Sequence, residues 1–170
     1  MRTAVLLLGL LMTAACAPVG SPIVVPEPTV GGQTGVAIAG DAKFRDPDAG
    51  RTRAGSVNAY RAERGRPPLR RSAVLDRIAA GHATDMARNR FFNHTGSDGS
   101  RVGDRARRQG YAFCQISENL ALAEGGEAAA VRLWSTSAGH RRTMLRRDVD
   151  EYGLAQRGAY LVLVTGRDGC

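Results

Sequence analysis

The chain has 170 residues, of which 43% are hydrophobic, and its formal net charge of +8 is carried almost entirely by arginine. This length suffices for one domain with a single buried core and leaves no room for several. The charge favours anionic partners, and the export signal described next argues against nucleic acid as one of them.

Residues 1–15 have the pattern of an export signal. Arg2 supplies a short positive region, and the apolar run from Ala4 to Met12 is too short to cross a bilayer. Small residues precede Cys16, as in a bacterial lipoprotein signal, which predicts cleavage before Cys16 and acylation of its thiol. The alternative is an ordinary signal peptide of the Ala-x-Ala type. Both interpretations place the mature chain outside the cytoplasm.

A lipid on Cys16 would anchor the protein in the cell envelope, on the periplasmic or cell-surface side. Ala17 after Cys16 fits outer-membrane sorting if the organism has two membranes. Residues 16–50 are rich in proline and glycine and show no helical or strand periodicity. We therefore expect a flexible tether between the anchor and a single domain at 51–170. Partners within reach are lipids and anionic envelope polymers.

The cysteine count predicts a disulfide. If Cys16 is lipidated, Cys114 and Cys170 remain as an even pair in an oxidising compartment. A bridge between them would close a long loop, which contributes about 4 kcal/mol in the chain-entropy model. The alternative is two free thiols.

Helical patterns dominate the first half of the domain. A helix is expected at 57–64, ended by Gly65 and the two prolines that follow. Ser72 is a candidate N-cap for a second helix, which ends near residues 89–93, and Ser100 for a third, which ends at Gly110. The second helix carries one apolar stripe: Val74, Leu75, Ile78, Ala79, His82, Ala83 and Met86.

The second half of the domain mixes helices with strands. Residues 111–120 predict a strand, 127–134 a fourth helix, and Ser137 caps a short fifth helical turn that carries His140. Residues 152–157 alternate in polarity, Gly158 allows a turn, and 159–165 form an apolar β-rich run. This order predicts an α+β fold with helices packed against a small sheet.

Several segments together closely resemble the motif set of the CAP superfamily (cysteine-rich secretory proteins, antigen 5 and pathogenesis-related proteins). The segments are Ala79-x-x-His82-Ala83-x-Asp85-Met86-Ala87, Phe92-Asn93-His94, Ser117-Glu118-Asn119-Leu120-Ala121 and Trp134-x-x-Ser137-x-x-His140-Arg141. The resemblance covers nearly all of 55–166. It implies a three-layer α-β-α sandwich with a small, mainly antiparallel sheet between helices.

The resemblance also implies a cleft lined by His94, Glu118, Ser137 and His140. Ser137 stands where many eukaryotic members carry a second glutamate, so the full set of two histidines and two glutamates is not present. His94 and His140 with Glu118 are suitable ligands for one divalent metal, zinc first, with a fourth position open to water or substrate. The alternative is that the histidines hydrogen-bond Glu118 and join a helix to the sheet, or that Glu118 only orients an imidazole.

The other prominent side chains have plainer interpretations. His82 is expected to be a partly buried scaffold residue, Trp134 and Val131 to be core, and Tyr60 and Tyr111 to belong either to the core or to the cleft. Two arginine clusters are expected to be mainly solvated faces. The clusters are Arg101, Arg105 and Arg108, and Arg141, Arg142, Arg146 and Arg147.

Three functions fit these residues. The first is a lipid-anchored binding module for a lipid, an envelope polymer or a protein. The second is a metal-dependent hydrolase or protease that uses His94, His140 and Glu118. The third is an adhesion or stress protein without a small ligand. No His-Glu-x-x-His pair, Gly-x-Ser-x-Gly elbow or phosphate loop is present, so the residues do not establish an enzyme.

Overall fold

The computed structural model describes residues 52–169, so the signal at 1–15, the expected tether and both Cys16 and Cys170 lie outside the described part. The elements are, in chain order, α1 (Val57–Ala62), β1 (Arg70–Arg71), α2 (Ala73–Asn89), α3 (Val102–Arg108), β2 (Phe113–Leu122), α4 (Gly126–Thr136), α5 (Ala138–Met144), β3 (Glu151–Arg157) and β4 (Tyr160–Asp168). Within this range, no helix has the length and apolar character needed to cross a membrane.

The four strands form one mixed sheet in the order β1-β3-β4-β2. The short β1 pairs parallel to β3, and the other neighbours are antiparallel. The long strand β2 lies at one edge of the sheet, with Glu118 opposite Val164 of β4. The central pair, β3 and β4, is joined by a tight turn in which Gly158 adopts a positive φ.

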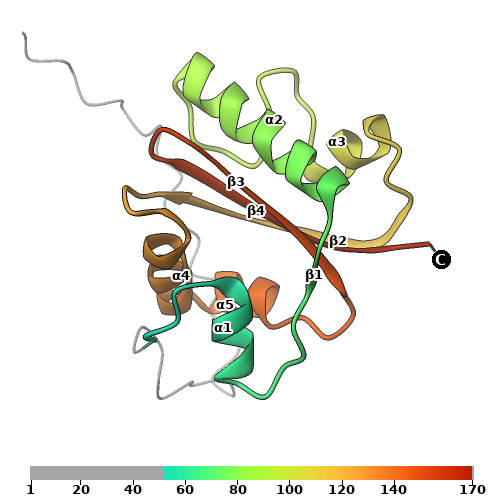
Figure 1. The fold of residues 1–170 in the computed structure, drawn as a ribbon. Helices are drawn as coiled ribbons and strands as arrows, with labels where there is room; N and C mark the ends of the chain where they lie inside the picture. The colour runs from blue at the N-terminus through green and yellow to red at the C-terminus, as the bar shows by residue number, and fades with distance from the viewer. Residues whose placement is uncertain (1–51, 170) are drawn as a thin grey trace, which may run out of the picture.

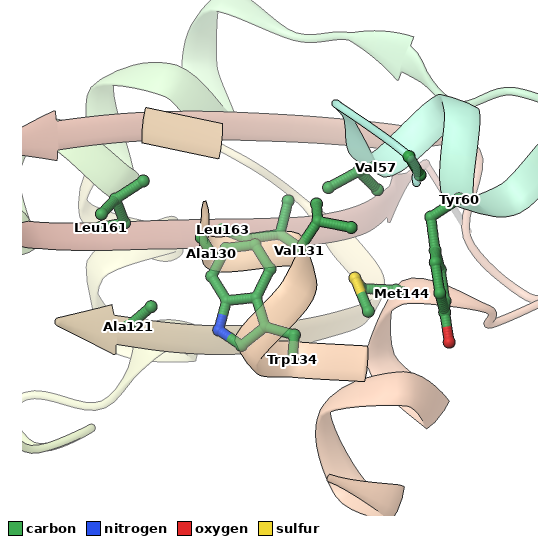
Figure 2. Close-up of a cluster of buried hydrophobic side chains, with 10 residues drawn as sticks. Val57, Tyr60, Ala121, Ala130, Val131, Trp134, Met144, Leu161 and Leu163 are labelled. Carbon is green, nitrogen blue, oxygen red and sulfur yellow. The ribbon is translucent and has the colours of Figure 1, made fainter. Parts of the chain in front are cut away.

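Helices cover both faces of this sheet, with α2 and α3 on one side and α1, α4 and α5 on the other (Figure 1). Each face has its own core. The α2 face buries Leu75, Ile78, Ala79, Ala83, Met86, Leu120, Val162 and Val164. The opposite face buries Val57, Tyr60, Ala121, Ala130, Val131, Trp134, Met144, Leu161 and Leu163 (Figure 2). The predicted three-layer sandwich is therefore confirmed.

Helix α2 approaches the sheet closely because β3 presents a glycine to it. A Cβ atom added at Gly153 would lie 2.1 Å from the backbone carbon of Leu75. Asp76 strengthens the same junction, since its Oδ1 accepts a hydrogen bond from the Leu154 backbone N–H at 2.9 Å. The position of α2, and of the loop that follows it, depends on this contact.

The predicted helices and late strands are confirmed with shifts of a few residues, and two details differ. The third helix begins after Arg101 rather than Ser100, and the Arg101 backbone N–H donates to Asp104 Oδ2 at 3.0 Å. The short strand β1 was not predicted, because two residues carry no periodicity. Tyr60 and Tyr111 are both buried and belong to the two cores rather than to a cleft.

The disulfide predicted between Cys114 and Cys170 stays a prediction, because Cys170 is outside the described range. The chain just before Cys170 does lie beside the start of β2. Phe113 pairs with Asp168, and the Gly169 N–H donates to the Ala112 carbonyl at 3.0 Å.

Candidate functional site

Glu118 is the centre of the site. It lies on the edge strand β2, and its side chain is only 2% exposed. Its Oε1 lies 2.8 Å from His94 Nδ1, and its Oε2 accepts a hydrogen bond from Arg105 Nη2 at 2.8 Å. A carboxylate this deeply buried needs such partners, because an isolated buried charge is strongly destabilising.

The contact with Glu118 sets the tautomer of His94. Because the carboxylate can only accept, His94 Nδ1 must carry the proton, and the neutral ring then has its lone pair on Nε2. The His94 side chain is 58% exposed, so this nitrogen is available to solvent. An imidazole oriented by a carboxylate in this way is the usual arrangement of a metal-binding histidine.

Arg105, on α3, also fixes the loop that carries His94. Besides Glu118, its guanidinium donates to the backbone carbonyls of Ser100 at 2.7 Å and His94 at 3.2 Å. The interpretation of Arg105 as part of a solvated face is therefore wrong, since the residue is a largely buried bridge between loop and strand. A buried glutamate needs a cation beside it, and this requirement is the feature of the sequence that points to an arginine such as Arg105.

Asp85 holds the same loop from the α2 side. Its two carboxylate oxygens accept hydrogen bonds from the backbone N–H of Ser97 at 2.9 Å and from the Ser97 hydroxyl at 2.6 Å. These bonds lower the pKa of Asp85 against the opposing effect of its burial, so the carboxylate remains ionised. The loop that carries His94 is thus fixed by Asp85 of α2 and by Arg105 of α3.

His140 reaches the site from α5, on the other face of the sheet. The side chain of Asn119 donates to the His140 backbone carbonyl at 3.0 Å. Successive residues of a strand point to opposite faces, so Glu118 orients His94 on one side while Asn119 positions His140 on the other. Burial lowers the pKa of His140, and the neighbouring His94 lowers it further. Its imidazole is therefore neutral at pH 7, the form that binds metal.

His82 is a scaffold residue, as predicted, but it is fully and not partly buried. It is buried on α2, and its Nε2 lies 2.9 Å from the Asn93 carbonyl, which only accepts, so Nε2 carries the proton. Burial is the main cause that lowers the pKa of His82, partly offset by Glu118, whose Oε1 is 3.9 Å away. A neutral His82 below the site ties α2 to the residue before His94.

Ser137 occupies the N-cap position of α5, three residues before His140. Its side chain makes no capping hydrogen bond to that helix and is half-buried. The structure therefore brings His94, Glu118 and His140 to one place. Ser137 lies three residues before His140, and within residues 52–169 its side chain makes no hydrogen bond that would assign it a role.

Glu118 is a poor candidate for a third metal ligand. Both of its oxygens are engaged, one by His94 and the other by Arg105. In residues 52–169, no three His, Cys, Asp or Glu side chains are grouped so that they could hold an ion. Of the two roles that the sequence left open, the geometry favours Glu118 as the residue that orients an imidazole.

Half of the second arginine cluster is also structural. Arg141 is buried and donates to the Ser135 carbonyl at 3.0 Å. Arg146 donates to Ser117 Oγ at 2.8 Å and to Gln115 Oε1 at 2.6 Å, and it pairs with Asp148. Arg142 and Arg147 remain exposed, as expected of a solvated face.

The same elements define a known family. Residues 55–157 match the cysteine-rich secretory protein (CAP) family. The chain belongs to this family. An extracellular protein of Bacillus anthracis that contains an SCP domain has a similar structure, with a TM-score of 0.63 and 27% identity over 66% of this chain and 38% of that one. An outer surface protein of Borrelia burgdorferi shares the fold, with a TM-score of 0.59 and 22% identity over 66% of this chain and 87% of that one.

Among curated proteins, the chain is similar to the uncharacterized membrane protein YlbC of Bacillus subtilis, with 31% identity over 98 residues, or 58% of this chain. The chain spans 28% of the length of that relative and 38% of the length of a second protein from the same organism, YkwD. The likeness therefore concerns only part of those proteins.

Proposed function

We propose that this CAP protein is an extracytoplasmic, lipid-anchored binding module whose cleft holds one divalent ion, zinc first, on His94 and His140. The observation that carries the proposal is the hydrogen bond from His94 Nδ1 to the buried Glu118, which leaves the exposed Nε2 as the lone-pair atom. Neutral imidazole nitrogen is a preferred ligand of zinc.

The donor set fits such an ion with only two protein ligands. His94 and His140 are close enough for the charge of His94 to lower the pKa of His140. The backbone carbonyl of each histidine accepts a side-chain hydrogen bond, from Arg105 and from Asn119 respectively. A bound ion would act as a Lewis acid and would leave further coordination positions for water or for a ligand. Glu118 would serve by orienting His94, and Arg105 by pairing with the Glu118 carboxylate.

This arrangement favours binding over hydrolysis. A metal-dependent hydrolase needs a group near the reacting water that can take up its proton. Glu118 is the acidic residue at this site, and its carboxylate is committed to the His94 N–H and to Arg105. The hydrolase remains the alternative, and a Glu118→Gln change separates the two, since a binding module keeps its ligand affinity whereas a hydrolase loses turnover.

The anchor and location are part of the same proposal. The lipoprotein-like sequence before Cys16 supports a lipid there, and relatives described as extracellular or outer surface proteins support export. A Cys16→Ala change should release the protein from the membrane fraction while its fold stays unchanged. Recovery of the variant in the membrane fraction at the wild-type level would contradict the anchor.

Metal content of the processed, full-length protein tests the cleft. We expect about one zinc per chain in the wild type and none above background in a His94→Ala, His140→Ala double variant, by elemental analysis. His82→Gln is the matched control, because His82 lies beneath the site but is bonded to the Asn93 carbonyl. A folded wild type without bound metal would overturn the metal site and leave the histidines as scaffold.

A further inference from the structure

The site lies on an open edge of the sheet. Among residues 52–169, strand β2 has β4 on one side and no strand on the other. The Ala123 N–H donates to the Ala159 carbonyl, so odd-numbered residues of β2 direct their main-chain groups toward β4. The Leu120 carbonyl accepts instead from the indole N–H of Trp134, which confirms that even-numbered residues point outward. Ile116 and Glu118 are therefore outward-facing.

The outward-facing main-chain groups of β2 are accessible to solvent near His94 and His140. The Glu118 side chain is 2% exposed although the residue as a whole is partly exposed, so its exposed atoms are main-chain atoms. Across residues 52–169, no turn, loop or cap hydrogen bond uses the main chain of Ile116 or Glu118. Exposed main-chain donors and acceptors in register are what an added strand pairs with.

Four arginines lie on the elements around this edge. Arg105 and Arg146 approach β2 at Glu118 and Ser117, and their charges are balanced by Glu118 and Asp148. Arg142 and Arg147, on the segment that follows His140, are exposed and pair with no carboxylate in the described domain. This charge disfavours a basic strand and a second copy of this cationic chain, and favours an acidic one.

An apolar patch continues the same edge at its C-terminal end. Leu122 is 43% exposed, and its side chain lies on the same face as that of Glu118. Its partner on β4, Tyr160, packs 6.5 Å from the ring of Phe92, which is 39% exposed. Phe92 precedes His94 by two residues, so the loop and the strand together extend the edge with an apolar surface.

We propose that the outer edge of β2 at Ile116 and Glu118 binds an extended acidic peptide segment of a partner protein by strand addition. The inference rests on the proposed binding role and names the class of ligand. Main-chain groups of Ile116 and Glu118 pair with the peptide, the exposed Arg142 and Arg147 attract its carboxylates, and the patch of Phe92, Leu122 and Tyr160 receives an apolar side chain. The peptide backbone then passes between His94 and His140, but the pairing does not require the ion.

The test uses the processed full-length protein and a short synthetic peptide that alternates glutamate with threonine and valine. Ile116→Pro removes one outward N–H without removing a bond to β4, and edge strands tolerate proline at such positions. Ile116→Ala is the matched control, because it loses more of the side chain but keeps the N–H. We expect the proline variant to bind the peptide about tenfold more weakly than the alanine variant, by calorimetry.

A second arm does not depend on any variant. The same peptide with alternate amides N-methylated cannot pair with a strand edge, and we expect no measurable binding of it to the wild type. Equal affinities for both peptides, equal affinities of both variants, or no binding of the unmodified peptide would overturn the proposal. A wild-type dimer that Ile116→Pro dissociates would also overturn it, because a second copy would then cover the edge. Peptide binding by the His94→Ala, His140→Ala variant separates this test from that of the metal site.

Discussion

At the scale of single residues, the site depends on a buried charge. The Glu118 carboxylate is buried inside the domain, where Arg105 faces one oxygen and the His94 N–H the other. Pairs of this kind add little to stability compared with apolar residues of the same size, but the loss of one partner is costly. Their use here is to hold the His94 ring in one orientation.

Removal of Arg105 should therefore destabilise the whole domain and not only the site. We expect Arg105→Leu to lower the free energy of unfolding by about 3 kcal/mol, because Glu118 is left buried without a cation. Arg107→Leu on the same helix is the control, since Arg107 is exposed and its pair with Asp104 contributes at most about 1 kcal/mol. Urea unfolding measures both. A similar small loss in the two variants would contradict the role of Arg105.

The histidines give the domain a pH dependence. Burial lowers the pKa of His82 and of His140 below the ordinary 6.5, so the unfolded chain binds protons at a higher pH than the folded one. Stability is then fully present above about pH 6.5 and falls as the pH drops below it. We expect a lower melting temperature near pH 5 than near pH 7.5.

A glutamine at position 82 isolates one histidine. Glutamine can donate to the Asn93 carbonyl as His82 does but does not titrate. The drop in melting temperature between pH 7.5 and pH 5 should be smaller in His82→Gln than in the wild type. An unchanged drop would show that His82 is not one of the groups responsible.

At the scale of elements, the contact of α2 with β3 places the His94 loop. Gly153 leaves no room for a side chain against the backbone of Leu75 and Asp76. Helix α2 therefore packs directly on the strand, and Asp85 near its C-terminal end holds the loop through Ser97. A change in this packing should therefore displace the loop that carries His94.

Two glycine substitutions test this contact. Gly153→Ala should destabilise the domain by about 3 kcal/mol, because backbone atoms must move to admit the methyl group. Gly81→Ala, within α2, meets no atom within 4 Å and should stabilise the helix by about 0.5–1 kcal/mol. Thermal unfolding of both variants gives the comparison. A neutral Gly153→Ala would mean that α2 can shift without cost.

At the scale of the whole molecule, two features connect the domain to its surroundings. The open edge of β2 offers main-chain groups to a partner, while the proposed lipid on Cys16 would restrict that partner to the envelope. The predicted disulfide would hold the C-terminus beside the start of β2, where Gly169 already bonds to Ala112.

The disulfide prediction can be checked by stability. Cys114→Ser and Cys170→Ser should each lower the free energy of unfolding by about 2–4 kcal/mol relative to the oxidised wild type. Reduced wild type should match both variants. Free thiols in the denatured, non-reduced protein would contradict the bridge, as would unequal losses in the two variants.

Local patterns of the sequence determined much of this protein. The apolar stripe of α2, the alternation in β3 and the apolar run of β4 predicted helices packed against a small sheet. The family resemblance of the motifs around His94, Glu118 and His140 implied the three layers and the cleft. Trp134 and Val131 were correctly expected in the core. These features depend on neighbours within a few residues, where the helical and strand periods apply.

Only the tertiary structure decided which partners those residues take. Arg105 reaches Glu118 from another element, and no local pattern distinguishes it from the exposed arginines nearby. The orientation of His94, the buried setting of Tyr60 and Tyr111, and the open edge of β2 likewise follow from strand order and from packing between distant segments. Periodicity shows which face of an element is buried, but the pairing of buried charges and the position of a strand within a sheet arise only when the elements assemble.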